Sequence, residues 1–244
     1  MEQGEVMGQN LEALLTAGAD KFGIRLDDSA AAAFMEYKRI LLEWNEKVNL
    51  TAIVEDREVI TKHFVDSLSI APFLKGVTNI IDVGTGAGFP GIPLKVALPS
   101  LEVVLLDSLE KRVSFLNTVI SSLQLKGITA VHSRAEDAGL SPKHREKFDA
   151  AAARAVAALP VLLEYCLPFV KPGGIFIAMK GSNTGEVAES KRALDILGGK
   201  IEEVREFTLP DSDMDRSIII VRKFRQTPAK YPRKAGKPTR EPLI

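Results

Sequence analysis

Residues 82–94, DVGTGAGFPGIPL, have the composition of a ligand cradle. A short apolar run precedes them and an apolar-periodic segment follows, so the sequence predicts a strand, a glycine-rich turn and the start of a helix. Gly84, Gly86 and Gly88 can adopt positive φ and have no Cβ, so a ligand can lie against bare backbone. The N-terminus of the following helix adds unpaired N–H groups. This pattern is typical of a site for a nucleotide-type ligand.

Two kinds of ligand compete for this turn. Gly86, Gly88 and Gly91 match the dinucleotide fingerprint G-x-G-x-x-G, but there the first glycine closes the strand, and here Gly84 already does so. Asp82 stands two residues before Gly84. This D-x-G-x-G-x-G arrangement resembles motif I of the class I S-adenosylmethionine (SAM) methyltransferases, in which the carboxylate helps to orient the methionine part. A carboxylate suits a cationic ligand better than a pyrophosphate, which favours SAM, although the glycines alone leave a dinucleotide or a ligand-free turn open.

The ends of the other predicted strands supply further candidates, because ligands of such sheets bind outside the carboxyl ends of the strands. The strand at 102–106 is followed by Asp107 and Ser108, where a carboxylate can accept hydrogen bonds from ribose hydroxyls. Asp107 could instead cap the next helix. The strands at 128–132, 148–152 and 174–179 are followed, in that order, by Ala135 and Glu136 at an adenine edge, by Arg154 beside the methyl group, and by Lys180. Arg154, as an orienting group, and Lys180 are the candidate catalytic residues.

The sequence offers few groups for other chemistry. No N-P-P-Y or D-P-P-Y motif follows the fourth strand, and Cys166 lies in an apolar helical segment typical of a core. The histidines lack metal-ligand spacing, so no metal site is predicted. His63, Asp66 and Ser67 superficially suggest a triad, but no strained nucleophile turn accompanies them. We expect these three residues to line the mouth of the cofactor site or simply to pack in a helix.

A methyl acceptor that needs no general base fits this limited set of reactive side chains. Guanine N7 has a free lone pair at neutral pH, so methyl transfer from a sulfonium requires mainly orientation and desolvation. The planar fork of Arg154 suits either guanine O6 or the methionine carboxylate.

Hydrophobic periodicity divides the chain into a helical front and an alternating remainder. Helices are predicted at 10–22, from about 28 to 49 and from 56 to about 73, with the first ten residues disordered. From there on, short apolar runs alternate with helices, which implies a mainly parallel sheet covered on both faces. The last two strands, at 200–208 and 216–224, are joined by a loop too short for a crossover, so they pair antiparallel. The predicted fold class is α/β, a doubly wound, Rossmann-like sheet of seven strands similar to the class I methyltransferase core, with an N-terminal helical extension.

The length and composition indicate one sizeable hydrophobic core. Of its 244 residues, 45% are hydrophobic, and the formal net charge is zero. One cysteine excludes an internal disulfide, and the sequence contains neither a membrane-spanning stretch nor a secretion signal, so we expect a cytoplasmic protein without membrane contact. The changes of pattern divide it into a helical subdomain at 1–76, a methyltransferase domain at 77–224 and a tail at 225–244.

The tail is basic and rich in proline. It holds six basic residues against one acidic residue, a formal charge of +5. Such a strip predicts a polyanion contact, although basic tails are often only solvated. We expect the tail to bind RNA, with the Tyr231 ring as a stacking face, and its removal to leave SAM affinity almost unchanged. The candidate RNA-binding residues are Lys230, Tyr231, Arg233, Lys234 and Lys237.

Several motifs in their joint order resemble one family, the ribosomal RNA small-subunit methyltransferase G family, also called the glucose-inhibited division protein B family. They are LLEWNEKVNLTAI, KHFVDSL, DVGTGAGFPGIPL, DSLEKR, RAED, ARAVAAL and TPAKYPRKAGKPTREPL. The resemblance implies methyl transfer from SAM to N7 of a guanosine in 16S rRNA, in the small ribosomal subunit or its assembly intermediate. We expect a monomer, although the sequence does not fix the oligomeric state. It also implies cofactor contacts at Gly84, Phe89, Ala135, Glu136 and Arg154.

Two alternatives remain at this point. One is a SAM-dependent methyltransferase of another RNA or of a small molecule, for which the polycationic tail offers no reason when the substrate is small. The other is an RNA-binding assembly factor whose SAM site is vestigial, which SAM calorimetry would separate from an enzyme.

Overall fold

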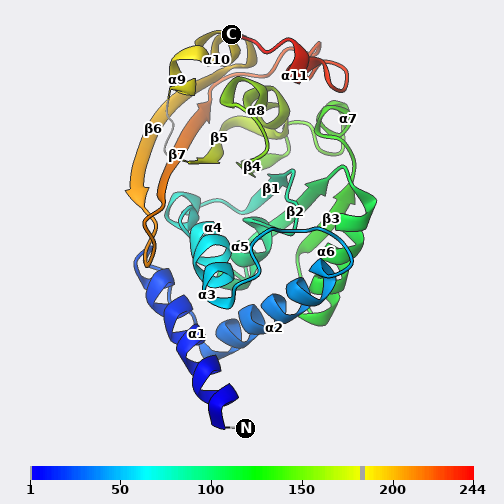
Figure 1. Ribbon diagram of the computed structural model, residues 1–244. Coiled ribbons are helices and arrows are strands. Elements are labelled where there is room, and N and C mark those ends of the chain that lie inside the picture. Colours follow the sequence, from blue (N-terminus) through cyan, green and yellow to red (C-terminus); the bar gives the residue numbers. More distant parts are fainter. Residues whose placement is uncertain (1, 182–184) are drawn as a thin grey trace.

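The computed structural model describes residues 2–181 and 185–244, and a single seven-stranded sheet forms its centre (Figure 1). The strands are β1 (Asn79–Val83), β2 (Glu102–Asp107), β3 (Ile128–His132), β4 (Phe148–Arg154), β5 (Val170–Lys180), β6 (Gly199–Thr208) and β7 (Asp215–Lys223). They lie in the order β3-β2-β1-β4-β5-β7-β6. The strands from β3 to β5 pair parallel, whereas β7 pairs antiparallel with both β5 and β6. The predicted mainly parallel sheet with an antiparallel last hairpin is confirmed.

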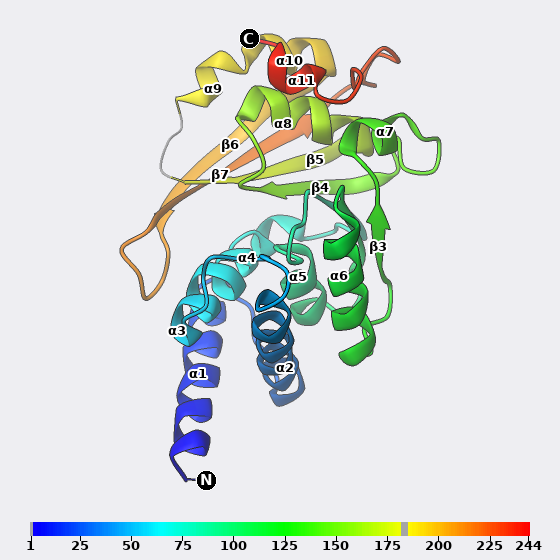
Figure 2. The same cartoon turned by 45° about the vertical axis from the view of Figure 1, so that its right-hand side comes forward.

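Two hydrophobic clusters cover the two faces of the sheet, because successive side chains of a strand point to opposite faces. Along β1, Ile80 belongs to one cluster, whereas Ile81 and Val83 belong to the other. The first face is covered by α1 (Glu2–Asp20), α2 (Asp28–Asn45), α5 (Gly91–Ala97) and α6 (Glu110–Ser122), and the second by α7 (Ala135–Leu140), α8 (Leu159–Cys166), α9 (Glu186–Glu189) and α10 (Lys191–Leu197). Figure 2 shows these two layers on opposite sides of the sheet. The carboxyl ends of the parallel strands therefore open between two packed layers.

The N-terminal helices pack in the same hydrophobic core as one face of the sheet. Helix α2 begins where the side chain of Asp27 accepts a hydrogen bond from the Ala30 N–H at 2.7 Å. Buried side chains of α1 and α2 lie in the same hydrophobic cluster as side chains of β1, β2 and β4. Helix α1 continues to Asp20, and the expectation that the first ten residues are disordered stays a prediction. The front therefore supports the strand ends directly.

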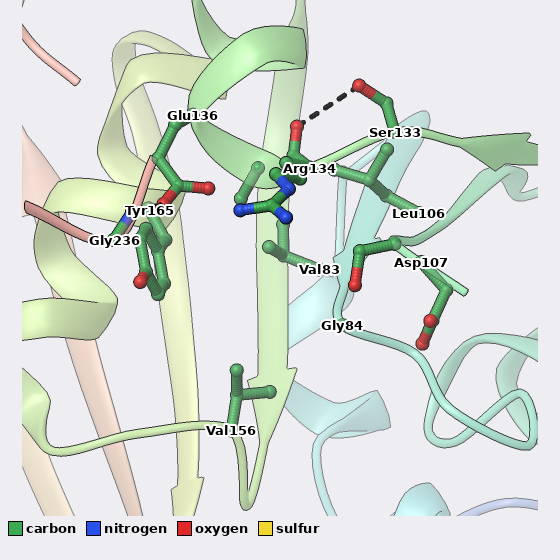
Figure 3. A pocket seen from close by; sticks show the side chains of 12 residues that line it. Val83, Gly84, Leu106, Asp107, Ser133, Arg134, Glu136, Val156, Tyr165 and Gly236 are labelled. Carbon is green, nitrogen blue, oxygen red and sulfur yellow. Dashed lines mark hydrogen bonds between the residues drawn. The ribbon is translucent and has the colours of Figure 1, made fainter. Parts of the chain in front are cut away.

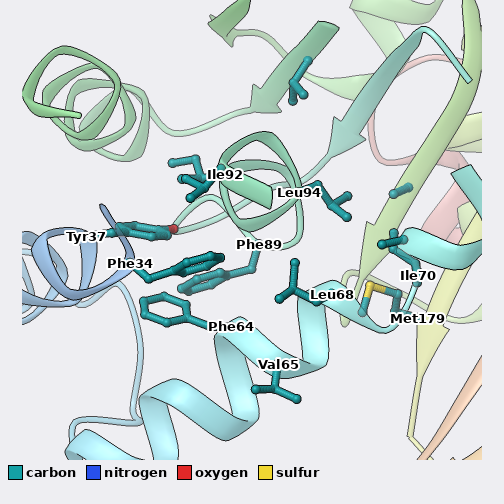
Figure 4. Packing of buried hydrophobic residues seen from close by; sticks show 14 of the residues in the cluster. Phe34, Tyr37, Phe64, Val65, Leu68, Ile70, Phe89, Ile92, Leu94 and Met179 are labelled. Atoms are coloured by element: carbon teal, nitrogen blue, oxygen red, sulfur yellow. The ribbon is translucent and has the colours of Figure 1, made fainter. Parts of the chain in front are cut away.

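The third predicted helix contains a change of helical type. It consists of α3 (Asp56–Val59), the π-helix η1 (Ile60–Val65) and α4 (Asp66–Leu68), and the 3₁₀-helix η2 (Ala71–Leu74) follows. Phe64 of η1 packs against Phe34 and Tyr37 of α2, with ring centroids 5.0 and 5.2 Å apart (Figure 4). A π-helical turn is unusual and is found frequently at functional sites. The segment places two polar side chains beside the strand ends, His63 from η1 and Asp66 from the start of α4.

The C-terminal tail folds back onto the second layer. Tyr231 and Leu243 are buried in the same cluster as α8 and α10, and the short helix α11 (Lys237–Arg240) lies beside α8. Arg145 donates to the carbonyl oxygens of Thr227, Pro228 and Tyr231. The remaining element, the 3₁₀-helix η3 (Leu167–Phe169), joins α8 to β5. None of the helices within the described residues is both long and apolar enough to cross a membrane.

Candidate cofactor and target site

The glycine turn after β1 is tied to the end of β2. Gly84, Gly86 and Gly88 have φ of +70°, +61° and +95°, a region that side chains with a Cβ rarely adopt. The Gly84 N–H donates to the Leu106 carbonyl oxygen at 2.8 Å, and the Gly86 N–H donates to Oδ2 of Asp107 at 2.9 Å. The sequence needs glycines here because the chain reverses tightly between a strand and a helix.

Asp82 lies beneath this turn and is fully buried. Its Oδ2 accepts hydrogen bonds from the Thr85 hydroxyl at 2.6 Å and from the Gly91 N–H at 2.8 Å, which ties the strand end to the helix start. Burial raises the pKa of Asp82 to about 6, against the lowering effect of these two hydrogen bonds. Its Oδ1 has no hydrogen-bond partner within the described residues. A buried acceptor without a partner at the base of a cradle fits a ligand that carries an ammonium group.

The first cavity lies directly beyond the turn and has a volume of about 250 Å³. Five predicted cofactor residues line it, namely Gly84, Asp107, Ser108, Ala135 and Glu136. Figure 3 shows Asp107 and Gly84 on one side of the cavity and Glu136 with Tyr165 on the other. The other two glycines of the motif and Phe89 are not among its lining residues. The cavity is a good fit for the adenosine part of SAM, with a carboxylate at the predicted ribose position.

Asp107 belongs to this site and not to a helix cap. Its Oδ1 accepts a hydrogen bond from the Leu109 N–H at 2.9 Å. Its Oδ2 accepts from the Gly86 N–H and lies 3.5 Å from Nη1 of Arg112. Helix α6 begins at Glu110, and its cap residue is Leu109, without a side-chain hydrogen bond. The alternative that Asp107 caps this helix is therefore wrong, because its carboxylate is held between the glycine turn and the loop after β2.

The tail closes the far end of this cavity, which sequence reasoning missed. Glu136 is buried, and its Oε1 accepts from the Gly236 N–H at 2.9 Å. Gly236 itself lines the cavity together with Tyr165, whose hydroxyl lies 2.9 Å from the Thr239 hydroxyl. A glycine 100 residues away in a basic tail carries no signal of this role. This contact favours a coupling between the tail and SAM affinity, in contrast to the expectation that removal of the tail leaves that affinity almost unchanged.

A second, larger cavity of about 660 Å³ adjoins the first at the end of β4. Ala155 lines the second cavity, and the next residue, Val156, lines the first. Both candidate catalytic residues are here. Lys180 bridges the Ala157 carbonyl oxygen at 2.8 Å and Glu186 at 2.9 Å. Its ammonium group thereby holds the loop after β4 to the start of α9.

Arg154 links β4 to the π-helix. Its Nη1 lies 3.1 Å from Oδ2 of Asp66 and 3.3 Å from the Lys62 carbonyl oxygen, and its Nη2 lies 3.3 Å from Nδ1 of His63. The other oxygen of Asp66 accepts from Nε of Arg216 at 3.0 Å. The resulting arrangement of two guanidinium groups on one buried carboxylate joins three elements that are distant in the sequence.

Phe89 packs against two residues that line the second cavity, His63 and Arg154. Its ring stacks on the imidazole of His63, with centroids 4.4 Å apart, and the Arg154 guanidinium lies 4.8 Å from its centroid. Figure 4 shows Phe89 within the aromatic cluster of Tyr37 and Phe64. The resemblance implies a cofactor contact at Phe89. The structure places its side chain behind the glycine turn, where it supports Arg154.

No hydrolytic triad forms in the π-helical segment. Ser67 is buried and donates to the His63 carbonyl oxygen at 2.5 Å, while Asp66 is held by two arginines. Burial, and then the charge of Arg154, lowers the pKa of His63 to about 3, so its ring is neutral at physiological pH. His63 and Asp66 line the mouth of the second cavity.

Two of the five residues predicted to bind RNA are engaged inside the protein. The Tyr231 side chain is only 7% exposed and packs in the second hydrophobic cluster, so the prediction of a free stacking face is wrong. Arg233 is bound to the buried carboxylate of Glu164 through Nε and Nη2 at 2.6–3.1 Å. Lys230, Lys234 and Lys237 remain exposed. The charge available to an external polyanion is accordingly smaller than the sequence indicates.

The sheet order, the glycine turn and the carboxylate after β2 together define a class I SAM-dependent methyltransferase. Among solved structures, the O-methyltransferase from Bacillus cereus in complex with SAH shares this fold, with a TM-score of 0.54 and 21% identity, covering 77% of this chain and 91% of that chain. The family model described as rRNA small subunit methyltransferase G matches residues 30–218. The chain belongs to this family, as its motifs predicted.

Two relatives illustrate how completely the chain matches. It is 62% identical over 234 residues to the ribosomal RNA small subunit methyltransferase G of Acetivibrio thermocellus, covering 96% of this chain and 97% of the relative. It is 53% identical over 233 residues to the protein of the same name from Alkaliphilus metalliredigens, covering 94% of this chain and 98% of that relative. The resemblance therefore spans both layers of the fold and the tail.

The conformation of Gly84 leads to a test of the cradle. We expect Gly84→Ala to weaken SAM binding by about tenfold or more, because a Cβ there would lie 2.8 Å from a methyl group of Val156 and φ is +70°. Gly86→Ala is the matched control, since its φ is +61° but nothing lies within 4 Å of its added Cβ. Isothermal calorimetry with SAM compares the two variants, and equal losses would contradict the role of Gly84 as a cavity wall.

Proposed function

We propose that this protein transfers the methyl group of SAM to N7 of a guanosine in 16S rRNA of the small ribosomal subunit. SAM, when bound, supplies an electrophilic methyl group on a sulfonium. The observation that carries the choice of acceptor is the chemistry of the second cavity, next to the cofactor site. Among the described residues that line it, each group that could take a proton is already engaged or too weakly basic. An acceptor atom with its own lone pair fits such a cavity.

The carboxylates and the histidine that line the second cavity already have partners. Asp66 is bound to Arg154 and Arg216, and Glu186 is bound to Lys180. His63 has a pKa of about 3, and its Nε2 lies 2.8 Å from the Thr51 hydroxyl. Guanine N7 needs no deprotonation, so the protein contributes position, desolvation and hydrogen bonds to the base. Arg154 is the group that we assign to guanine O6, since its side chain lines the second cavity and is held there by Asp66.

Family membership supports the choice of substrate. The family description and the relatives' names specify the small-subunit rRNA. The target is presented by the small subunit or by an assembly intermediate, and the enzyme acts in the cytoplasm as a monomer. The presentation of the target and the cellular location rest on the resemblance to the family, and the monomeric state is part of the proposal.

Nucleoside mapping tests the proposed function. The 16S rRNA is purified from cells with the gene and from cells without it, digested to nucleosides and compared by mass spectrometry. We expect one 7-methylguanosine to be lost in the strain that lacks the gene and to return when the gene is restored. An unchanged level of 7-methylguanosine would refute the proposal.

The three exposed lysines of the tail lead to a separate prediction about RNA affinity. Lys230, Lys234 and Lys237 lie on one basic segment beyond the last strand. Replacing all three by glutamine is expected to weaken RNA binding and to reduce the slope of log affinity against log salt by about 2–3, because each phosphate contact contributes about 0.7–0.9. Filter binding at several salt concentrations measures the slope. The same slope in both proteins would mean that the tail is only solvated.

A further inference from the structure

The loop that joins α2 to α3, residues 46–55, holds the hydroxyl of Thr51 in a fixed place. Oδ1 of Asn45, the last residue of α2, accepts hydrogen bonds from the Leu50 N–H at 2.8 Å and from the Thr51 N–H at 2.9 Å. Oγ1 of Thr51 accepts another from the Ile53 N–H at 3.0 Å. Ile53 lines the second cavity, whereas Thr51 is not among the described residues that line either cavity. The Thr51 hydroxyl is therefore anchored outside the two cavities.

His63 is the side chain that this hydroxyl reaches. Its Nε2 lies 2.8 Å from Oγ1 of Thr51, and its Nδ1 lies 3.3 Å from Nη2 of Arg154. The His63 ring also stacks on Phe89 with centroids 4.4 Å apart, and His63 is only 9% exposed. The stacking fixes the plane of the imidazole, and the two polar contacts fix its rotation within that plane.

The donors and acceptors around His63 select one tautomer. A guanidinium group has no acceptor, so the His63 nitrogen that faces Arg154 must offer its lone pair. The ring is neutral, because burial and then the charge of Arg154 lower the pKa of His63 to about 3. Its single proton therefore lies on Nε2 and points at Thr51, whose oxygen has two lone pairs and accepts from both His63 and Ile53. The opposite tautomer would turn an N–H toward the guanidinium and lose the hydrogen bond with Arg154.

We propose that Thr51 is a positioning residue for methyl transfer, which acts on Arg154 through His63. Nη1 of Arg154 is held by Asp66 and by the Lys62 carbonyl oxygen. Among the described residues, His63 is the hydrogen-bond partner of Nη2. Without the Thr51 hydroxyl, the Nε2–H of His63 would be buried without this acceptor, which favours a displaced ring and a less firmly held Arg154. The inference rests on the proposed function, in which Arg154 binds the target guanine.

Single-turnover methylation of small subunits from cells that lack the gene tests this role. We expect Thr51→Val to slow the transfer about tenfold at saturating SAM and subunits, because a displaced donor is less well oriented. Thr51→Ser keeps the hydroxyl and should restore the rate to within about twofold of the wild-type rate. The matched control is Thr118→Val, because Thr118 also has a bonded hydroxyl, which donates to the Ser114 carbonyl oxygen on α6 at 3.1 Å. A wild-type rate in Thr51→Val would overturn the inference.

A double variant separates positioning from a general effect on the loop. In the Arg154→Ala background, Thr51→Val is expected to cause no further loss of rate, because the side chain that Thr51 positions is absent. A loop that merely loses stability would slow the enzyme by the same factor in both backgrounds. Equal factors would therefore overturn the inference, and the melting temperatures of all these proteins show that they are folded in the assay.

Nitrogen NMR tests the tautomer in the wild-type protein and does not depend on turnover. The chain has three histidines, and a spectrum of His63→Asn identifies the imidazole signals of His63. At neutral pH we expect the Nε2–H tautomer, with this proton exchanging about tenfold faster in Thr51→Val than in Thr51→Ser, since valine offers no acceptor. An Nδ1–H tautomer or a protonated ring in the wild-type protein would overturn the inference, as would equal exchange rates in the two variants. If the wild-type enzyme forms no 7-methylguanosine, the proposed function fails, and these spectra still decide whether Thr51 holds His63.

Discussion

Arg154→Ala is expected to reduce kcat/KM for methyl transfer by about 100-fold or more, the loss typical of removing one oriented donor from a reacting site. The side chain ties β4 to the π-helix through Asp66 and the Lys62 carbonyl oxygen, and it lies against Phe89 of the glycine turn. Removal of the Arg154 side chain therefore disturbs the lining of the second cavity, which adjoins the first cavity. Single-turnover methylation of small subunits measures the effect.

Stability must be followed in the same experiment. Asp66 keeps Arg216 as a partner in the Arg154→Ala protein, so we expect a loss of about 3 kcal/mol or less, at the low end for a broken buried ion pair. Arg154→Lys retains the charge but not the planar fork, and it should be folded and still impaired. Full activity of either variant at a temperature where it is folded would refute the role of Arg154. Arg205→Ala, an arginine on β6 that pairs with Glu203, serves as the control.

Arg233→Ala is expected to lower the melting temperature by about 6–20 °C. The change leaves the charge of Glu164, whose side chain is 1% exposed, buried without its partner, which costs about 3–5 kcal/mol. Each kcal/mol corresponds to about 2–4 °C for a chain of this length. Thermal unfolding followed by circular dichroism measures the shift. Lys234→Ala is the matched control, because Lys234 is the adjacent cation and is exposed.

The same variant should bind SAM several-fold more weakly. Arg233 fixes the tail three residues before Gly236, whose N–H holds Glu136 at the end of the cofactor cavity. Loosening the tail therefore removes one wall of that cavity. Calorimetry with SAM at a temperature where both proteins are folded tests this coupling, and equal affinities in the two proteins would show that the tail and the cofactor site are independent.

The tail shows where local patterns mislead. Six basic residues among prolines are typical of a solvated polyanion-binding strip, and nothing nearby in the sequence indicates otherwise. The partner that neutralises Arg233 is a glutamate 69 residues earlier, in an apolar helix. Only the packing of the tail on α8 brings the two together, and it also buries Tyr231. Exposure is a property of the folded surface, so charge counting along the chain does not reveal it.

The sequence by itself determined the order of strands and helices along the chain and the glycine turn, and it predicted candidate cofactor residues at the strand ends. These features are local, because periodicity of two or 3.6 residues and the need for positive φ are written in neighbouring residues. The tertiary structure decided what distant segments build together. Asp66, Arg154 and Arg216 come from α4, β4 and β7, and Gly236 reaches Glu136 from the tail. Such contacts depend on the packing of whole layers, which a pattern of adjacent residues does not encode.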